Sequence, residues 1–240
     1  MEKFFRYLGH KAGPSIRKGK WIYHSYFADK ETALQSEHLV GRELSAGISK
    51  ELNFSNDSQT QALLKDIRDQ LYTCIKDKRR RFAYYIVDSK DLNAFALPGG
   101  FIYITDALIK NSRMDRNELA FVLAHEMVHV VLKHPLKRIM SNFSFKVVEN
   151  LMRTRGAAGQ IAKQTLSSLL RNGYSRENEF DADQYAVKIM ASAGFDAKGA
   201  ISLLHHLNQN KSDDPDFFNY FSTHPPIEER IERIKSILSQ

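Results

Sequence analysis

Hydrophobic residues recur every three or four positions through much of this 240-residue chain, and this spacing predicts a mostly helical protein. Between residues 57 and 78 a continuous apolar stripe follows Asp57 and Ser58, either of which can cap a helix. The first 30 residues hold several glycines and a proline, so we expect irregular or weakly helical structure there. Further helices are predicted at 31–50, 142–154, 158–171, 175–193, 197–209 and 226–238.

Three short runs rich in aromatic and β-branched residues interrupt this helical pattern. Residues 82–88, 93–97 and 101–105 predict strands, and Pro98-Gly99-Gly100 joins the last two. Thr105 or Asp106 then caps a short helix. The pattern indicates an α+β fold that is one mostly helical, compact domain with a small β-sheet. Within it, residues 1–80 form an N-terminal helical region packed on a core of residues 81–240.

A long helix from Asp115 to about Met140 carries the chemistry, although Pro135 can kink it or end it early. His125 and His129 are four positions apart, about 6 Å along a helix axis, so both imidazoles can reach one zinc ion. Glu126 is rotated about 100° from His125 and can serve as a general base on water. The pattern alone also fits an amphipathic helix with two incidental histidines.

A catalytic zinc ion needs a third protein ligand. His134 lies nine residues after His125, where a charged or polar residue at a helix end is the better interpretation. Downstream, Glu179 and Asp183 share a helix face, so one carboxylate could bind the metal while the other orients an imidazole. A solvent-exposed acidic helix start fits the same residues.

Four motifs occur in order over roughly residues 80–235. They are Asn93-Ala94-Phe95-Ala96-Leu97-Pro98-Gly99-Gly100, His125-Glu126-x-x-His129, Glu179-Phe180-Asp181-Ala182-Asp183 and Thr223-His224-Pro225-Pro226. Together they resemble the M48 family of zinc metallopeptidases, which includes Ste24-, HtpX- and Oma1-like enzymes. This chain departs from the Ste24- and HtpX-like members because it lacks transmembrane helices, and it is more similar to the soluble or peripheral members.

The resemblance implies a gluzincin-like fold, with the sheet beside the zinc helix, and one Zn²⁺ per chain. It assigns His125, His129 and Glu179 as zinc ligands, Glu126 as general base and Asp183 to the surroundings of the metal. The implied activity is zinc-dependent endoproteolysis of polypeptides.

Two further features extend this hypothesis. His224, held before two prolines, either donates to the oxyanion or covers the metal in a latent state; a third interpretation is a histidine that caps the last helix. The motif from Asn93 to Gly100 predicts an exposed strand edge that pairs with extended substrate, and a structural hairpin is the competing interpretation. The substrate-binding residues would be Asn93, Ala94, Phe95, Ala96, Gly99 and Gly100.

Composition narrows the remaining classes. Cys74 is the only cysteine, so no internal disulfide forms and any zinc is held by His and carboxylate groups. The net charge of +7 gathers at Lys11–Lys20 and Lys76–Arg81, which we interpret as solvated segments because no nucleic-acid motif accompanies them. Peripheral membrane contact through the basic N-terminus stays open.

No apolar run has transmembrane length. The chain as given predicts a cytoplasmic protein, and a removed leader or lipid anchor would leave no trace in it. The alternative function is a low-turnover binding or chaperone-like protein that uses the same zinc groove.

Overall fold

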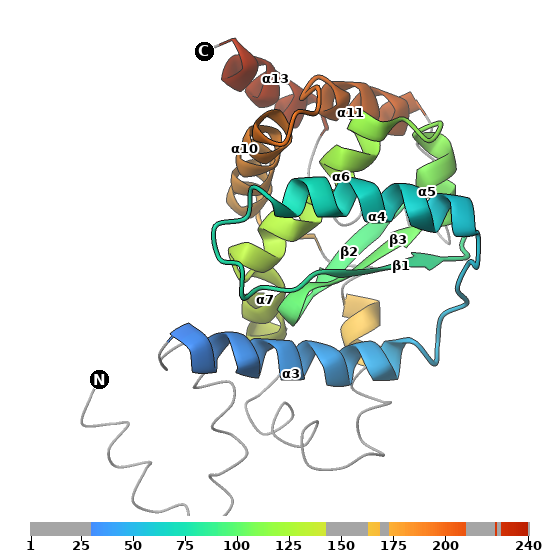
Figure 1. Ribbon diagram of the computed structural model, residues 1–240, viewed down its shortest axis with the longest axis vertical. Helices are drawn as coiled ribbons and strands as arrows, with labels where there is room; N and C mark the ends of the chain where they lie inside the picture. Colours follow the sequence, from blue (N-terminus) through green and yellow to red (C-terminus); the bar gives the residue numbers. More distant parts are fainter. Residues whose placement is uncertain (1–29, 143–162, 169–172, 210–223, 225–226, 240) are drawn as a thin grey trace, which may run out of the picture.

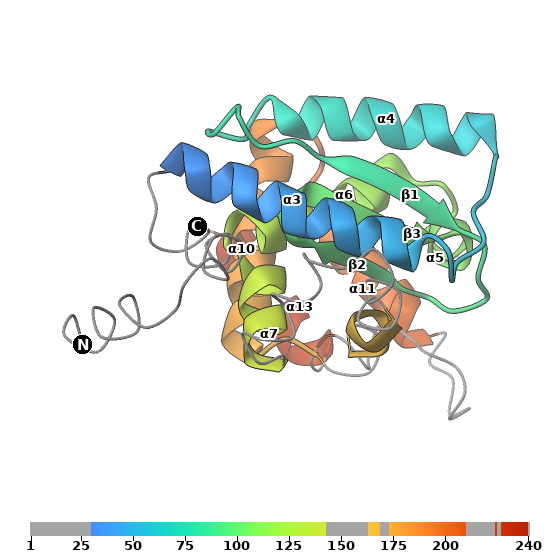
Figure 2. The same cartoon turned by 90° about the horizontal axis from the view of Figure 1, so that it is seen from below.

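Two helical layers enclose a three-stranded sheet (Figures 1 and 2). The structure is a computed structural model that describes residues 30–142, 163–168, 173–209, 224 and 227–239. The predictions for residues 1–29, 143–162 and 169–172, and for Pro225 and Pro226, lie outside these ranges. A helical segment at 163–168 is the part of the predicted helix 158–171 that is described.

The sheet has the order β1-β3-β2, with β3 in the centre. β1 (Ala83–Val87) pairs in parallel with β3 (Phe101–Thr105), and β2 (Ala94–Leu97) pairs with β3 in antiparallel fashion. The turn η1 (Pro98–Gly100) joins β2 to β3. All three predicted strands are therefore confirmed, which agrees with their aromatic and β-branched composition.

Each face of the sheet packs against different helices. On one face, Ile102 and Ile104 join the main core with α4 (Ser58–Tyr72) and α6 (Arg116–Val131). On the other, Phe101 and Tyr103 pack against α3 (Lys30–Ile48), which Figure 1 shows running beneath the strands. This division follows from the two-residue period of a strand, because neighbouring side chains point to opposite faces.

Most helix starts follow the predicted caps. Asp57 caps α4, and Thr105 caps α5 (Asp106–Asn111). The described C-terminal helices pack beyond α6, at the top of Figure 1. They are α10 (Arg176–Ser192), α11 (Gly199–Gln209) and α13 (Ile227–Leu238).

The long helix predicted from Asp115 to Met140 is wrong in its extent. α6 ends at Val131, and a second helix, α7 (His134–Asn142), begins after a bend of 58°. The break comes at Lys133, whose φ of 61° is left-handed, and so precedes Pro135. Pro135 lies in the first turn of α7, where a missing N–H costs nothing.

Among the described residues, no single helix is long and apolar enough to cross a membrane. In the part of the chain that the structure describes, one bent pair of helices, α6–α7, reaches that length and composition when the two are taken together.

Candidate metal centre

α6 brings two imidazoles together in the core. Its N-terminus is fixed by Asp115, which accepts hydrogen bonds from the backbone N–H groups of Asn117 and Glu118. The Nε2 atoms of His125 and His129 lie 2.9 Å apart. Both side chains are fully buried, so these nitrogens face each other in a space that excludes water.

α10 supplies the carboxylate that the two imidazoles lack. Ser175 caps this helix, as predicted, and Glu179 lies in its first turn. The Glu179 oxygens lie 3.3 Å from Nε2 of His125 and 3.4 Å from Nε2 of His129. Because Glu179 and Asp183 are both buried, they do not form a solvent-exposed acidic helix start.

His224 completes a cluster of four possible ligands. One donor atom from each of His125, His129, Glu179 and His224 lies within 4.8 Å of the others. The Nδ1 of His224 donates to Oε2 of Glu179 at 2.6 Å. Burial lowers the pKa of His224 to about 4, although Glu179 opposes this shift, so its imidazole is neutral.

The donor set fits a zinc ion. Two imidazoles and a glutamate are a known ligand set of catalytic zinc, with a further position left for water or substrate. The cluster is also rich in acceptors that lack a protein donor. Among the described residues, Oε1 of Glu179 and Oε2 of Glu126 are buried without a hydrogen-bond partner. A bound cation would compensate these carboxylates.

Electrostatics distinguishes the two helix histidines. Burial by itself lowers the pKa of His125, but its bonds to Asp183 and Glu179 outweigh burial and raise that pKa to about 9. Burial and the neighbouring His125 hold the pKa of His129 well below its usual range. Metal binding requires neutral imidazoles, so a zinc ion would displace the proton from His125.

Each ligand ring is oriented through its Nδ1 atom. The Nδ1 of His125 lies 3.0 Å from Asp183, which is the contact that the sequence predicted. The Nδ1 of His129 lies 2.9 Å from Nδ1 of His134. Such contacts fix the tautomer and the direction of a metal-binding imidazole.

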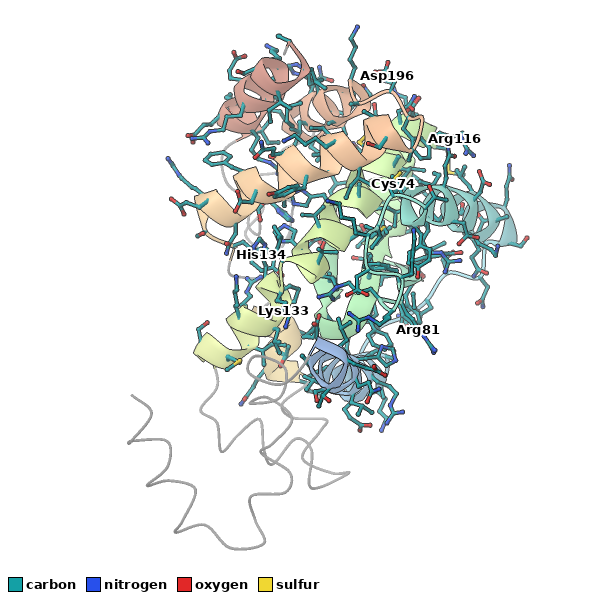
Figure 3. The ribbon with its side chains drawn as sticks, turned by 60° about the vertical axis from the view of Figure 1, so that its left-hand side comes forward. Cys74, Arg81, Arg116, Lys133, His134 and Asp196 are labelled. Carbon is teal, nitrogen blue, oxygen red and sulfur yellow. The ribbon has the colours of Figure 1, made fainter. Side chains whose placement is uncertain are left out.

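The expectation for His134 as a polar residue at a helix end is partly wrong. His134 does begin α7, beside Lys133 at its junction with α6 (Figure 3), but its side chain is buried. Burial lowers the pKa of His134 to about 4, so the ring is neutral and its Nδ1 can accept a hydrogen bond from the Nδ1–H of His129. It lies next to the metal cluster without belonging to it.

Arg230 is a residue of the site that the sequence analysis missed. Its guanidinium donates two hydrogen bonds to Asp183, at 2.8 and 2.7 Å, and a further nitrogen lies 3.9 Å from Glu179. Arg230 is fully buried. One signal in the sequence could have indicated this role: Arg230 lies on the same helix face as Ile227 and Ile234, which are buried. An arginine on a buried face requires a carboxylate as partner.

Tyr174 was also missed, although it directly precedes the predicted cap Ser175. Its ring stacks on His129 with a centroid distance of 4.2 Å and an interplanar angle of 20°. The guanidinium of Arg138, on α7, lies 4.6 Å from the centre of the same ring. Tyr174 thus forms one wall of the cluster and limits rotation of the His129 ring.

The Glu126 side chain is buried and interacts electrostatically with His125 and Glu179. Burial raises the pKa of Glu126 to about 7, and the nearby His125 opposes that shift. A carboxylate with a pKa near neutrality can both accept and return a proton. This is the property that a general base needs.

The predicted substrate strand is correct in position and wrong in exposure. β2 is one of the two edge strands of the described sheet and packs beside α6. However, Ala94–Leu97 are all buried, and α7 contacts the strand. Gly99 and Gly100 adopt φ values of 75° and 93°, which explains the glycines at this turn.

This helix-borne His-Glu-x-x-His motif with a glutamate from a later helix defines a gluzincin-type metal centre. The sequence model of peptidase family M48 matches residues 58–238, and the chain belongs to this family.

Characterised relatives support the assignment. Metalloprotease YcaL of Escherichia coli is 26% identical over 157 residues, which cover 63% of this chain and 60% of that protein. Metalloprotease LoiP of the same organism is 27% identical, covering 65% and 62%. Mitochondrial metalloendopeptidase OMA1 of Bos taurus is 26% identical, covering 78% and 40%. The chain thus aligns with less than two thirds of each relative.

Proposed function

We propose that this chain is a zinc-dependent endopeptidase that hydrolyses peptide bonds in extended or unfolded polypeptides. One observation carries the proposal: the buried convergence of His125, His129 and Glu179, with Glu126 beside them. Membership of family M48 and the relatives named metalloproteases support the same activity.

In this proposal, His125, His129 and Glu179 hold one zinc ion per chain. When bound, zinc supplies Lewis-acid chemistry that polarises a water molecule and the scissile carbonyl group. Asp183 and His134 keep the two imidazoles in the orientation that presents Nε2 to the ion, and Arg230 fixes Asp183 in turn.

Glu126 would accept the proton of the attacking water and pass it to the leaving amine. Its carboxylate lies in a buried site, where competing hydrogen bonds from bulk water are absent.

Substrate would reach the site as an extended segment beside β2. Backbone pairing with an edge strand recognises main-chain groups, so it favours unfolded over folded polypeptides. Because β2 and the four-residue cluster are buried, substrate entry requires the site to open. His224, bonded to Glu179, would then be the group that keeps the closed state latent.

Glu126→Gln tests the activity directly. The amide keeps the volume of the side chain but cannot take a proton, so we expect hydrolysis of an unfolded protein to fall about 10²–10⁴-fold. Zinc content should stay at the wild-type level, because Glu126 is not a ligand in this proposal. A binding or chaperone-like protein would instead show no change, and equal rates of cleavage of folded and unfolded forms of one substrate would contradict the preference for extended chains.

A further inference from the structure

α3 packs so closely against the turn η1 that there is no room for side chains between their backbones. A Cβ atom on Gly41 would lie 1.7 Å from the carbonyl oxygen of Pro98, and one on Gly99 would lie 2.4 Å from Cα of His38. The ring nitrogen Nδ1 of His38 donates to the carbonyl oxygen of Gly99 at 3.2 Å. The helix therefore holds this turn through both sterics and hydrogen bonding.

A buried ion pair joins the same turn to α6. Oε1 of Glu37 accepts hydrogen bonds from Nη1 of Arg80 and from the backbone N–H of Gly99, both at 3.2 Å. Nη2 of Arg80 lies 3.5 Å from the carbonyl oxygen of Val131, the last residue of α6. The two charged side chains are 1% and 8% exposed, so the pair is shielded from water and salt.

Arg80 differs from its neighbours in the basic run. Lys78 donates to the carbonyl oxygens of Tyr72 and Thr73 at the end of α4, and Arg79 pairs with Asp77. Arg81 follows at the end of the sheet near α3 (Figure 3). Arg80 alone among these four residues is buried. The run is thus better explained by local structure than by a surface for nucleic acid.

The position of the pair relates it to the active site. Gly99 lies two residues after the end of β2, the candidate substrate strand, while Val131 comes two residues after His129. Movement at either end would change the backbone groups that β2 presents to an extended peptide beside the metal. Loss of such pairing weakens substrate binding without altering the groups that perform the chemistry, so its effect falls on KM.

We propose that Glu37 and Arg80 are positioning residues that hold the end of the substrate strand in register with the end of the metal-binding helix. Glu37 lies on α3, before the residues 58–238 that the family model matches. The N-terminal helix thereby contributes to substrate alignment without contacting substrate. The expected effect on substrate kinetics rests on the proposed function. The connection between the turn η1 and the end of α6 does not.

The kinetic test compares three proteins: wild type, Glu37→Gln, and the double variant Glu37→Gln with Arg80→Met. Gln keeps the shape of Glu37 but leaves Arg80 as a buried charge without a counter-charge, so this variant should lose stability. The double variant removes both charges and should recover most of that loss. If the pair positions substrate, KM for an unfolded-peptide substrate rises about tenfold in both variants.

In both variants, kcat should stay within about threefold and zinc content should be unchanged. A merely structural role predicts the opposite pattern, in which KM returns to the wild-type value in the double variant as stability recovers. That result would overturn the proposal. The matched control is Asp66→Asn, which breaks the exposed ion pair between Asp66 and Arg116 on α4 and α6 and should leave KM unchanged.

Hydrogen exchange provides a test that needs no activity. In Glu37→Gln, amides of residues 94–101 and of residues 128–134 should exchange faster together, while α10 stays unchanged. Faster exchange in only one of these two segments would overturn the proposed connection. If the wild-type protein is inactive but the two segments respond together, the proposed function fails and the structural connection stands.

Discussion

Charged groups are buried at two neighbouring places along α6, and the two places differ in composition. Around His125 and His129, imidazoles and carboxylates lie together, and Oε1 of Glu179 and Oε2 of Glu126 have no hydrogen-bond partner although Arg230 is near. Near Val131, Glu37 meets Arg80, so a negative charge is paired with a positive one. The first arrangement calls for an added cation, whereas in the second the two charges compensate each other, although Oε2 of Glu37 lacks a hydrogen-bond partner among the described residues.

This difference indicates which buried polar groups bind a metal ion and which hold parts of the backbone in place. A cluster of acceptors has a cost in free energy until a cation binds, so selection for a ligand explains it. A paired Glu and Arg need no ligand, and their contribution is to fix backbone groups that they bond. The comparison can be tested by changing each place separately and following zinc, stability and activity.

The largest effect is expected from His129→Ala. Removing one of two helix ligands leaves an incomplete zinc site, so bound zinc and peptide hydrolysis should both fall to background. Zinc analysis of the purified variant, together with a protease assay, measures this. The variant with Glu37→Gln is the matched comparison, because it should keep its zinc. Retention of a full zinc equivalent by His129→Ala would show that the metal lies elsewhere.

Arg230→Met should give the next largest effect, a loss in the free energy of unfolding. The size of this loss should depend on whether zinc is bound. Removing one partner of a buried ion pair costs about 3–5 kcal/mol in free energy of unfolding. Bound zinc should offset part of this loss, because its charge compensates Glu179 and, through His125, Asp183. Denaturant unfolding with zinc and with a chelator measures the difference.

For Glu37→Gln, the loss of stability should be the same with and without zinc, since no metal ligand contacts that pair in the part of the chain described. Equal losses for Arg230→Met in the two conditions would contradict the distinction between the two places.

His224→Ala should give the smallest change, and in the opposite direction. Since His224 lies within the ligand cluster and bonds Glu179, its removal should open the site, retain zinc and raise peptide hydrolysis a few-fold. Steady-state kinetics on an unfolded substrate measures the change. Lost activity with retained zinc would instead assign His224 to stabilisation of the oxyanion.

Local signals in the sequence predicted most of the fold. The caps Asp57, Thr105 and Ser175 lie where their chemistry requires, because each side chain bonds a backbone N–H only two or three residues away. The three strands were recognisable from composition. The break after Val131 was placed wrongly, since it depends on the left-handed conformation of Lys133 rather than on Pro135.

The metal ligands were predictable because the motif and the resemblance each name specific positions. The surrounding groups were harder to identify, since their roles depend on contacts between distant segments. Arg230 reaches Asp183 across 47 residues, and Arg80 reaches Glu37 across 43. The exposed substrate edge was wrong for the same reason: the sequence predicts the strand, while its burial depends on contacts with α6, α3 and α7.

The central claim is that the cluster on α6 and α10 holds zinc and that Glu126 moves the proton. Zinc content and degradation of an unfolded protein, measured side by side for wild type and Glu126→Gln, test it most directly. Repeating the pair in the His224→Ala background removes any latency of the closed site. We predict one zinc per chain in every protein and a loss of hydrolysis of about 10²–10⁴-fold with each Glu126→Gln change. Equal hydrolysis with and without Glu126, or no zinc in the wild type, would contradict the account.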